Sequence, residues 1–172
     1  RLQEATDALE AFGGLYLKQS MASGVIPQIT AIFGTCGGGL AVIPGLTDFT
    51  FMESKSGKLF VNSPNALAGN EISKCDTSSA DYQSEVAGLV DGVGSETEIL
   101  GQIRTLVTLL PANNEDDLSY EECTDDLNRV CPDLANAAED TAIALAQIAD
   151  NQSFFEVKSA FAKEMVTGFI RL

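Results

Sequence analysis

The chain has 172 residues, 45% of them hydrophobic and 20% charged, which is enough to build a folded domain around a core. Its 10 Lys and Arg stand against 25 Asp and Glu, for a formal net charge of -15 at pH 7. Such a charge repels nucleic-acid phosphates and anionic lipids, so we expect no binding to nucleic acid.

The first predicted element is an amphipathic helix from Leu2 to about Ser23. Residues 27–33 follow as a short run between Pro and Gly, the pattern of a buried strand, and a glycine-rich loop comes directly after it. In the helix, apolar residues recur at steps of three and four, which predicts one buried stripe made of Leu2, Ala5, Leu9, Phe12 and Tyr16.

Two further apolar segments, residues 49–52 and 58–62, are separated by Ser-Gly and are predicted to be strands. We expect residues 63–85 to be a loop with a short helix, and residues 87–93 to form a weak strand. The clearest helix covers residues 96–110, where Ser95 and Glu98 have the spacing of a capping box and Pro111 ends the element.

The segment after Pro111 indicates a domain boundary. A helix capped by Asp140 and running through Ala149 is predicted beyond it, then strands at residues 153–157 and 165–172. We expect the residues after Pro111 to stay out of the core of residues 1–110. The reason is an acidic run without Lys or Arg, expected to be a solvated linker and made of Glu115, Asp116, Asp117, Glu121, Glu122, Asp125 and Asp126.

Taken together, the alternation of strands and helices predicts an α/β domain whose helices cover a largely buried sheet. The sequence begins at Arg1 rather than Met, and residues 165–172 end it on an apolar run without a turn signal. We therefore expect an internal fragment of a longer protein.

Four cysteines and the absence of a long apolar run bear on cellular location. The apolar runs fall short of the roughly 20 residues that a membrane span needs. The cysteines are too few and too scattered for a disulfide framework, so we expect reduced thiols in the cytoplasm. Cys123 and Cys131 stand eight residues apart in a chain without His, and we expect no metal site.

The glycine-rich loop is the feature with the most chemical content. It lies between a predicted strand and an apolar segment that we expect to start a helix. Glycines let a ligand approach the backbone N–H groups, and at a helix N-terminus these groups stabilise negative charge. That arrangement suits an oxyanion hole or a phosphate cradle, formed by Gly34, Thr35, Cys36, Gly37, Gly38 and Gly39.

The residues after the loop and the spacing of its glycines exclude two kinds of phosphate-binding motif. A phosphate loop needs Lys followed by Ser or Thr after its last glycine, whereas Leu40 and Ala41 stand here, and the glycine spacing does not fit a dinucleotide fingerprint. Two interpretations stay open: an oxyanion loop, or glycines that only permit close packing of a helix and a strand. Cys36 lacks a His partner in the chain and is expected to be a small buried side chain rather than a nucleophile.

A longer stretch around this loop is similar to a known family. Residues 24–52 resemble the central segment of the carboxyltransferase subunits of biotin-dependent acyl-CoA carboxylases and decarboxylases, of the crotonase-like superfamily. There a strand, a Gly-x-Cys-x-Gly-Gly loop and a Pro-x-Leu-Thr-Asp-Phe stretch occur in this order. The similarity continues through residues 1–4, 110–114 and 154–172.

This resemblance implies a partial crotonase-like (ClpP/crotonase) α/β fold. Residues 1–112 would form the C-terminal half of the N-terminal carboxyltransferase domain, residues 113–132 an acidic linker, and residues 133–172 the beginning of the C-terminal domain. The protein would move a carboxyl group between biotin and an acyl-CoA of the acetyl-, propionyl-, methylmalonyl- or glutaconyl-CoA type. The fragment alone is expected to be inactive.

Residue roles and partners follow from the same resemblance. Biotin would sit on a separate biotin carboxyl carrier protein, the subunits would form a homo-oligomer, and a membrane would be involved only indirectly, through a decarboxylase pump. The alternatives are a crotonase-type enoyl-CoA hydratase or isomerase and a non-catalytic assembly fragment. The N–H groups of Gly38 and Gly39 would hold the enolate oxygen, and the acyl-CoA would contact Gly34, Thr35, Cys36, Gly37 and Pro64.

Overall fold

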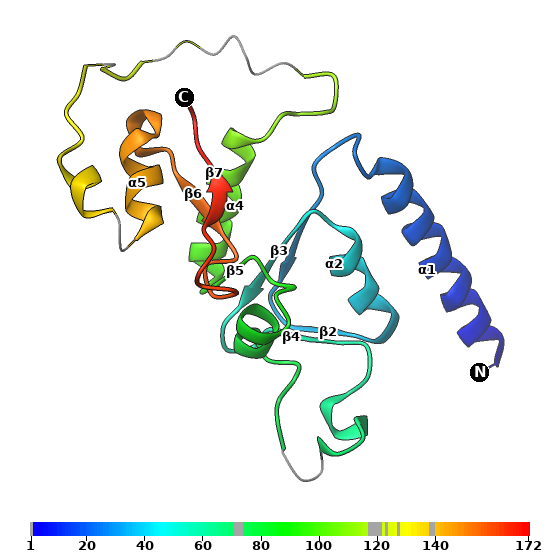
Figure 1. Ribbon diagram of the computed structural model, residues 1–172. Helices are drawn as coiled ribbons and strands as arrows, with labels where there is room; N and C mark the ends of the chain where they lie inside the picture. The colour runs from blue at the N-terminus through cyan, green and yellow to red at the C-terminus, as the bar shows by residue number, and fades with distance from the viewer. Residues whose placement is uncertain (1, 71–73, 117–121, 123, 127, 138–139) are drawn as a thin grey trace.

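The structure is a computed structural model that describes residues 2–70, 74–116, 122, 124–126, 128–137 and 140–172 (Figure 1). Its central element is a sheet of three parallel strands in the order β1-β3-β5, formed by residues Ile29–Ile32, Phe49–Glu53 and Gly92–Gly94. Strands β2 (Thr35–Gly37) and β4 (Lys58–Phe60) form a second parallel pair. Strands β6 (Phe155–Val157) and β7 (Thr167–Phe169) form an antiparallel hairpin.

Among the described residues, the α-helices that accompany these strands are α1 (Leu2–Ala22), α2 (Val42–Leu46), α4 (Glu96–Leu109) and α5 (Thr141–Ile148). The expected caps of the last two are present. Ser95 and Glu98 form a complete capping box at α4, and the Asp140 carboxylate accepts from the Ala142 N–H at α5. Short helical turns fill the connections, at Gly38–Ala41, Pro64–Ala66, Tyr82–Val86, Pro132–Asn136 and Asp150–Gln152.

The three-stranded sheet is buried on both faces because β3 sends alternate side chains to opposite sides. Met52 packs with Ile32, Leu59 and Val90 on one face. Phe51 packs on the other face, where α4 contributes Ile99, Ile103 and Leu106. The expected α/β arrangement, with a helix covering a buried sheet, is therefore present.

The β6–β7 hairpin corrects one expectation. Phe155 and Phe169 pack against the core formed by β3 and α4, and the Phe169 ring meets Phe49 edge-to-face with the ring centres 5.6 Å apart. Figure 1 shows β6 and β7 beside α4. Our prediction that residues after Pro111 stay out of the first core is wrong for this hairpin. Its few apolar side chains cannot bury themselves against each other alone, so they complete the core of the preceding sheet.

Helix α1 departs from expectation in its burial. The helix has the predicted extent, but Ala5 and Leu9 of its predicted stripe are exposed, and 72% of Leu9 is accessible. Phe12 and Tyr16 are half-buried, and Figure 1 shows α1 standing to one side of the sheet, beside α2. A periodic pattern identifies the face of a helix that can be buried, not the partner that covers it.

Smaller differences concern strand limits. Residues 87–93 were predicted to be a strand, but β5 begins only at Gly92. The residues before β5 are not part of a strand, although Val90 among them is buried in the core. Strand β2 lies within the segment predicted to be loop. It was not predicted because it forms by pairing with β4, which is far away in the sequence. The acidic run lies partly outside the described residues. Within it, Asp125 forms an ion pair of 2.8 Å with Arg129.

Replacing Phe169 with Ala should destabilise the fold. We expect a loss of roughly 2 to 3 kcal/mol in the free energy of unfolding, somewhat below the typical cost for a fully buried Phe because this ring is only partly buried. Urea unfolding measures the change. Val130→Ala is the control, since Val130 is 84% exposed. Equal midpoints for Phe169→Ala and Val130→Ala would show that the hairpin does not belong to this core.

Candidate functional site

Two contacts fix where the glycine-rich loop begins. The Lys58 N–H donates to the Gly34 carbonyl at 3.0 Å, and the Ser56 hydroxyl donates to the Phe33 carbonyl at 2.8 Å. Strand β2 continues this attachment by pairing Gly37 with Phe60. The loop is therefore held by the β3–β4 turn and by β4 before it enters the helical segment.

The end of the loop turns sharply into a helical segment. Gly37 is extended (φ -125°), whereas Gly38 has φ +62°, a conformation that favours glycine, and Gly38–Ala41 form a 3-10 turn that leads into α2. The first N–H groups of such a turn have no carbonyl acceptor within it. Apart from its own neighbours in the chain, no atom of the described residues lies within 4 Å of the position that a Cβ of Gly38 would take. The N–H groups of Gly38 and Gly39 thus begin a helical segment, with open space beside Gly38.

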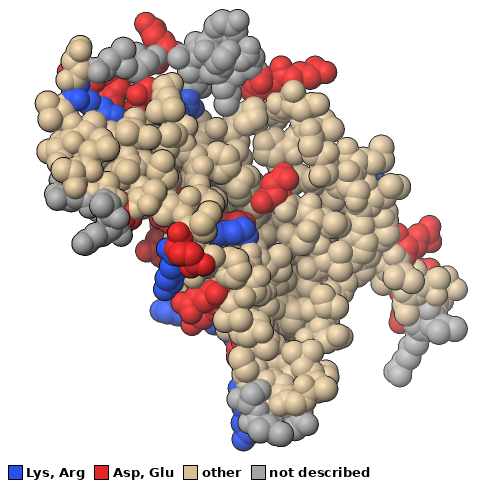
Figure 2. Space-filling view, in the orientation of Figure 1, with Lys and Arg blue, Asp and Glu red and all other residues tan. Residues whose placement is uncertain are grey.

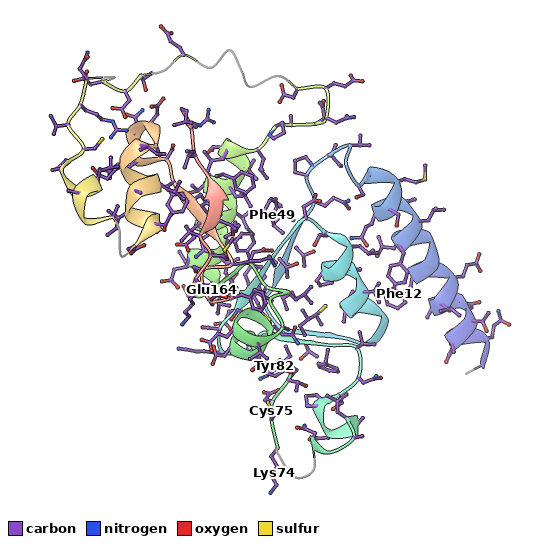
Figure 3. The ribbon with its side chains drawn as sticks, in the orientation of Figure 1. Phe12, Phe49, Lys74, Cys75, Tyr82 and Glu164 are labelled. Atoms are coloured by element: carbon purple, nitrogen blue, oxygen red, sulfur yellow. The ribbon has the colours of Figure 1, made fainter. Side chains whose placement is uncertain are left out.

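Helix α1 contacts the loop at Gly39. The Tyr16 hydroxyl donates to the Gly39 carbonyl, and a Cβ at Gly39 would lie 3.2 Å from both the Tyr16 oxygen and the Phe12 ring. The Phe12 and Tyr16 rings stack with their centres 5.9 Å apart, and Figure 3 shows Phe12 between α1 and α2. On the other side, a Cβ at Gly37 would come within 2.8 Å of the Phe60 ring. Close packing thus favours glycine at these two positions, most strongly at Gly37.

A largely apolar cavity of about 250 Å³ lies alongside the loop, between β1 and α2. Three of the predicted substrate-binding residues, Gly34, Thr35 and Cys36, line it together with Leu40 and Ile43. Pro64 lies elsewhere, in a more polar hollow of about 620 Å³. Phe60 lines this second hollow and also packs against Gly37 of the loop.

Cys36 is buried in the core below the loop, and this burial raises the pKa of its thiol. A raised pKa keeps the thiol protonated near neutral pH and makes it a poor nucleophile. Cys75 and Cys131 are free as well, whereas Cys123 lies outside the described residues. The geometry agrees with the expectation of a packing role for Cys36.

Within the described part of the chain, no three His, Cys, Asp or Glu side chains come together as a metal would require. None of the described helices combines the length and apolar character needed to cross a bilayer. On the face of the molecule drawn in Figure 2, charged side chains gather near the middle and around the acidic stretch, and few lie over α2.

Sequence reasoning missed Tyr16 and Phe60 as neighbours of the loop. Tyr16 was assigned to a buried stripe and Phe60 to a strand, and nothing local in the sequence shows that both contact glycines of the loop. The two contacts depend on the helix position and on the β2–β4 register. Only the neighbouring small residues, Gly37 and Gly39, carried a signal that bulky groups come close.

Comparison with known proteins places the whole chain in one group. The family model "Carboxyl transferase domain" matches residues 1–172. The methylmalonyl-CoA decarboxylase subunit alpha of Veillonella parvula is 34% identical over 182 residues, covering 99% of this chain and 36% of that protein. The propionyl-CoA carboxylase beta chain of Roseobacter denitrificans is 33% identical over 183 residues, covering 100% and 36%. The chain thus spans about a third of the length of these relatives.

Solved structures show the same likeness. Transcarboxylase 12S, determined with methylmalonyl-coenzyme A and methylmalonic acid bound, matches with a TM-score of 0.86 at 27% identity, over 100% of this chain and 35% of that one. The geranyl-CoA carboxylase beta subunit of P. aeruginosa matches with a TM-score of 0.56 at 22% identity, over 99% and 34%, which concerns the fold alone. The expected crotonase-like carboxyltransferase fold, in partial form, is confirmed.

Alkylation should distinguish the buried Cys36 from the exposed Cys75. At neutral pH we expect iodoacetamide to modify Cys75 at least roughly tenfold faster, because burial of Cys36 both shields the thiol and raises its pKa. Peptide mass spectrometry over a time course measures both rates in the same sample. Equal rates would mean that Cys36 is accessible and ionised.

A pH effect is expected at the β3–β4 turn that holds the loop. Hydrogen bonds from the Ser56 side chain and backbone lower the pKa of the Glu53 carboxyl from 4.5 to about 2. Because the folded-state pKa is the lower one, the stabilisation is complete above the ordinary value and is lost as pH falls through about 2. Glu53→Gln should therefore have a lower urea midpoint than wild type at neutral pH.

This difference should shrink as the pH approaches about 2, because the wild-type carboxylate becomes protonated there. Urea midpoints of both proteins, measured from neutral pH down to the lowest pH at which they stay folded, give the comparison. A difference that stays constant over that range would contradict the role assigned to the ionised carboxylate.

Proposed function

The chain belongs to the carboxyl transferase domain family, and we propose that the protein moves a carboxyl group between biotin and an acyl-CoA. The observation that carries this proposal is the helical turn that begins at Gly38, with open space beside it. Its N–H groups suit an oxygen that gains negative charge. The names of the relatives, which include carboxylases and a decarboxylase of acyl-CoA, support the same reaction class.

In this mechanism the Gly38 and Gly39 N–H groups donate to the thioester oxygen of the acyl-CoA. Loss of a proton or of the carboxyl group from the α-carbon places negative charge on that oxygen, and fixed donors lower the energy of the resulting enolate because they need not reorganise. Biotin on a carrier protein would supply the carboxyl group to the α-carbon and take up the α-proton, or in the reverse direction accept the carboxyl group and return the proton. Tyr16 and Phe60 hold the loop in place from either side.

Substrate contacts are proposed for two regions. Gly34, Thr35 and Cys36 line the apolar cavity, where an acyl group would lie, and Leu40 of its lining directly follows the donor Gly39 in the chain. Pro64 and Phe60 line the more polar hollow, a suitable place for a longer polar part of the substrate. Propionyl-CoA and methylmalonyl-CoA are the proposed substrates, after the names of the relatives.

The assembly is part of the proposal. We assign residues 1–112, 113–132 and 133–172 to the end of one carboxyltransferase domain, an acidic linker and the start of a second domain. The packing of β6 and β7 on the first core means that the two domains share an interface. A cytoplasmic homo-oligomer that works with a biotin carrier protein is proposed, and the solved transcarboxylase 12S is described as a hexamer assembly.

The alternative function, an enoyl-CoA hydratase, has no support among the names of the relatives given above.

Replacing Gly38 with Val should impair carboxyl transfer in the native protein. The substitution places a β-branched residue at φ +62°, which shifts the donor N–H groups even though the surrounding space is open. Loss of one oxyanion donor typically lowers turnover about a hundredfold or more. Carboxyl transfer from a malonyl-type CoA to free biotin measures the rate, and thermal melting shows whether the variant is folded.

Cys36→Ala is the matched control at the same loop. It should keep most of the activity, since no step is assigned to its thiol and the other residues that line the proposed acyl cavity remain. A folded Gly38→Val protein at the wild-type rate, or a folded Cys36→Ala protein without activity, would contradict the assignment.

A further inference from the structure

Helix α2, which continues from the glycine loop, is tied to β3 at its other end. The Thr50 hydroxyl donates to the Pro44 carbonyl at 3.2 Å, and the Thr47 hydroxyl donates to the same carbonyl at 3.1 Å. Pro44 and Thr50 are buried, with Thr50 only 1% exposed. A buried polar group without its partner costs free energy, so these bonds define where α2 lies on the sheet.

Thr50 is in turn bonded to Asp91 in both directions. The Thr50 N–H donates to the Asp91 carboxylate at 2.7 Å, and the Asp91 N–H donates to the Thr50 carbonyl at 2.7 Å. Asp91 precedes β5 and is 9% exposed. A carboxylate in such a position requires a compensating positive charge as well as hydrogen bonds.

That charge comes from Lys158, which follows β6 and lies far from Asp91 in sequence. Its ammonium group is 3.2 Å from the Asp91 carboxylate and donates to the Gly88 carbonyl at 2.5 Å. Its backbone N–H donates to the Asp91 carbonyl at 3.0 Å. Lys158 also has φ +56°, a conformation that costs energy for a non-glycine residue and that these contacts maintain.

We propose that Lys158 and Asp91 are positioning residues for the oxyanion loop. They act through a continuous set of contacts: Lys158 to Asp91, Asp91 to Thr50, and Thr50 to the Pro44 carbonyl of α2. Because the same helical segment begins at Gly38, a shift of α2 along the sheet moves the donor N–H groups. Residues of the segment after the acidic run thereby set the geometry of a site in the first half of the chain.

The effect of Lys158 and Asp91 on catalysis rests on the proposed function, whereas their effect on the position of α2 does not. The positioning itself can be tested without activity, by hydrogen exchange of backbone amides in the native protein. In Lys158→Met the Asp91 carboxylate loses its cation, so the Thr50 N–H should exchange faster. If the contacts reach α2, amides of residues 38–46 should exchange faster as well. Lys163→Met is the control, because Lys163 is an exposed lysine of the same segment.

The kinetic arm separates positioning from a loss of folded protein. A loss of folded enzyme would lower the measured rate and the active fraction together. A displaced loop lowers kcat for acyl-CoA in the folded enzyme, by roughly ten- to a hundredfold, with little change in KM. Lys158→Arg, which keeps the charge, should recover much of the rate, whereas Asp91→Asn should resemble Lys158→Met.

The exchange measurement and the kinetic measurement each have an outcome that would contradict the positioning proposal. Faster exchange confined to residues 88–91 and 156–160, with residues 38–46 unchanged from wild type, would show that the ion pair does not position α2. Wild-type kcat in a folded Lys158→Met protein would do the same. A wild-type protein that does not transfer carboxyl groups at all would refute the proposed function, while the exchange data would still decide the positioning proposal. If Lys158→Met does not fold, the same measurements on Lys158→Arg and Asp91→Asn decide.

Discussion

Strand β3 supports the rest of the structure because it is paired on both edges and buried on both faces. Its neighbours β1 and β5 take its backbone hydrogen bonds, and its side chains alternate between two separate clusters. Thr50 is a buried polar residue of this strand, and its bonds to Asp91 and Pro44 connect the strand to the segment before β5 and to α2. Helix α2, which follows the glycine loop, is only five residues long, so its position on the sheet depends on this connection.

The sequence allowed the local elements to be predicted well. Helix α4 carries its own signals, since the capping box at Ser95 and the apolar stripe need no distant partner. The glycines of the loop could also be picked out, because their spacing excluded phosphate and dinucleotide motifs. Whether the loop served as an oxyanion hole or only allowed close packing could not be decided from spacing. The structure shows that close packing applies to Gly37 and Gly39, whereas Gly38 is held in its conformation beside open space.

The long-range features could not be predicted. The β2–β4 pairing, the contact of Tyr16 with the loop and the Lys158–Asp91 ion pair each join segments that are separated along the chain. No periodicity or spacing records such a pairing, because it depends on how the sheet orders its strands. The hairpin was misassigned for the same reason. Its apolar residues were recognised as strands, but the domain boundary inferred from the acidic run suggested that they packed elsewhere.

The contact between Phe49 and Phe169 has a consequence for how the chain reaches its folded state. During synthesis, β3 and α4 leave the ribosome well before β7, so the apolar face that they share stays uncovered until the hairpin follows. Contacts between residues so far apart also slow folding, because a long loop must close before they form. The acidic run lies within that loop, and its like charges favour a solvated connection between the two packed segments.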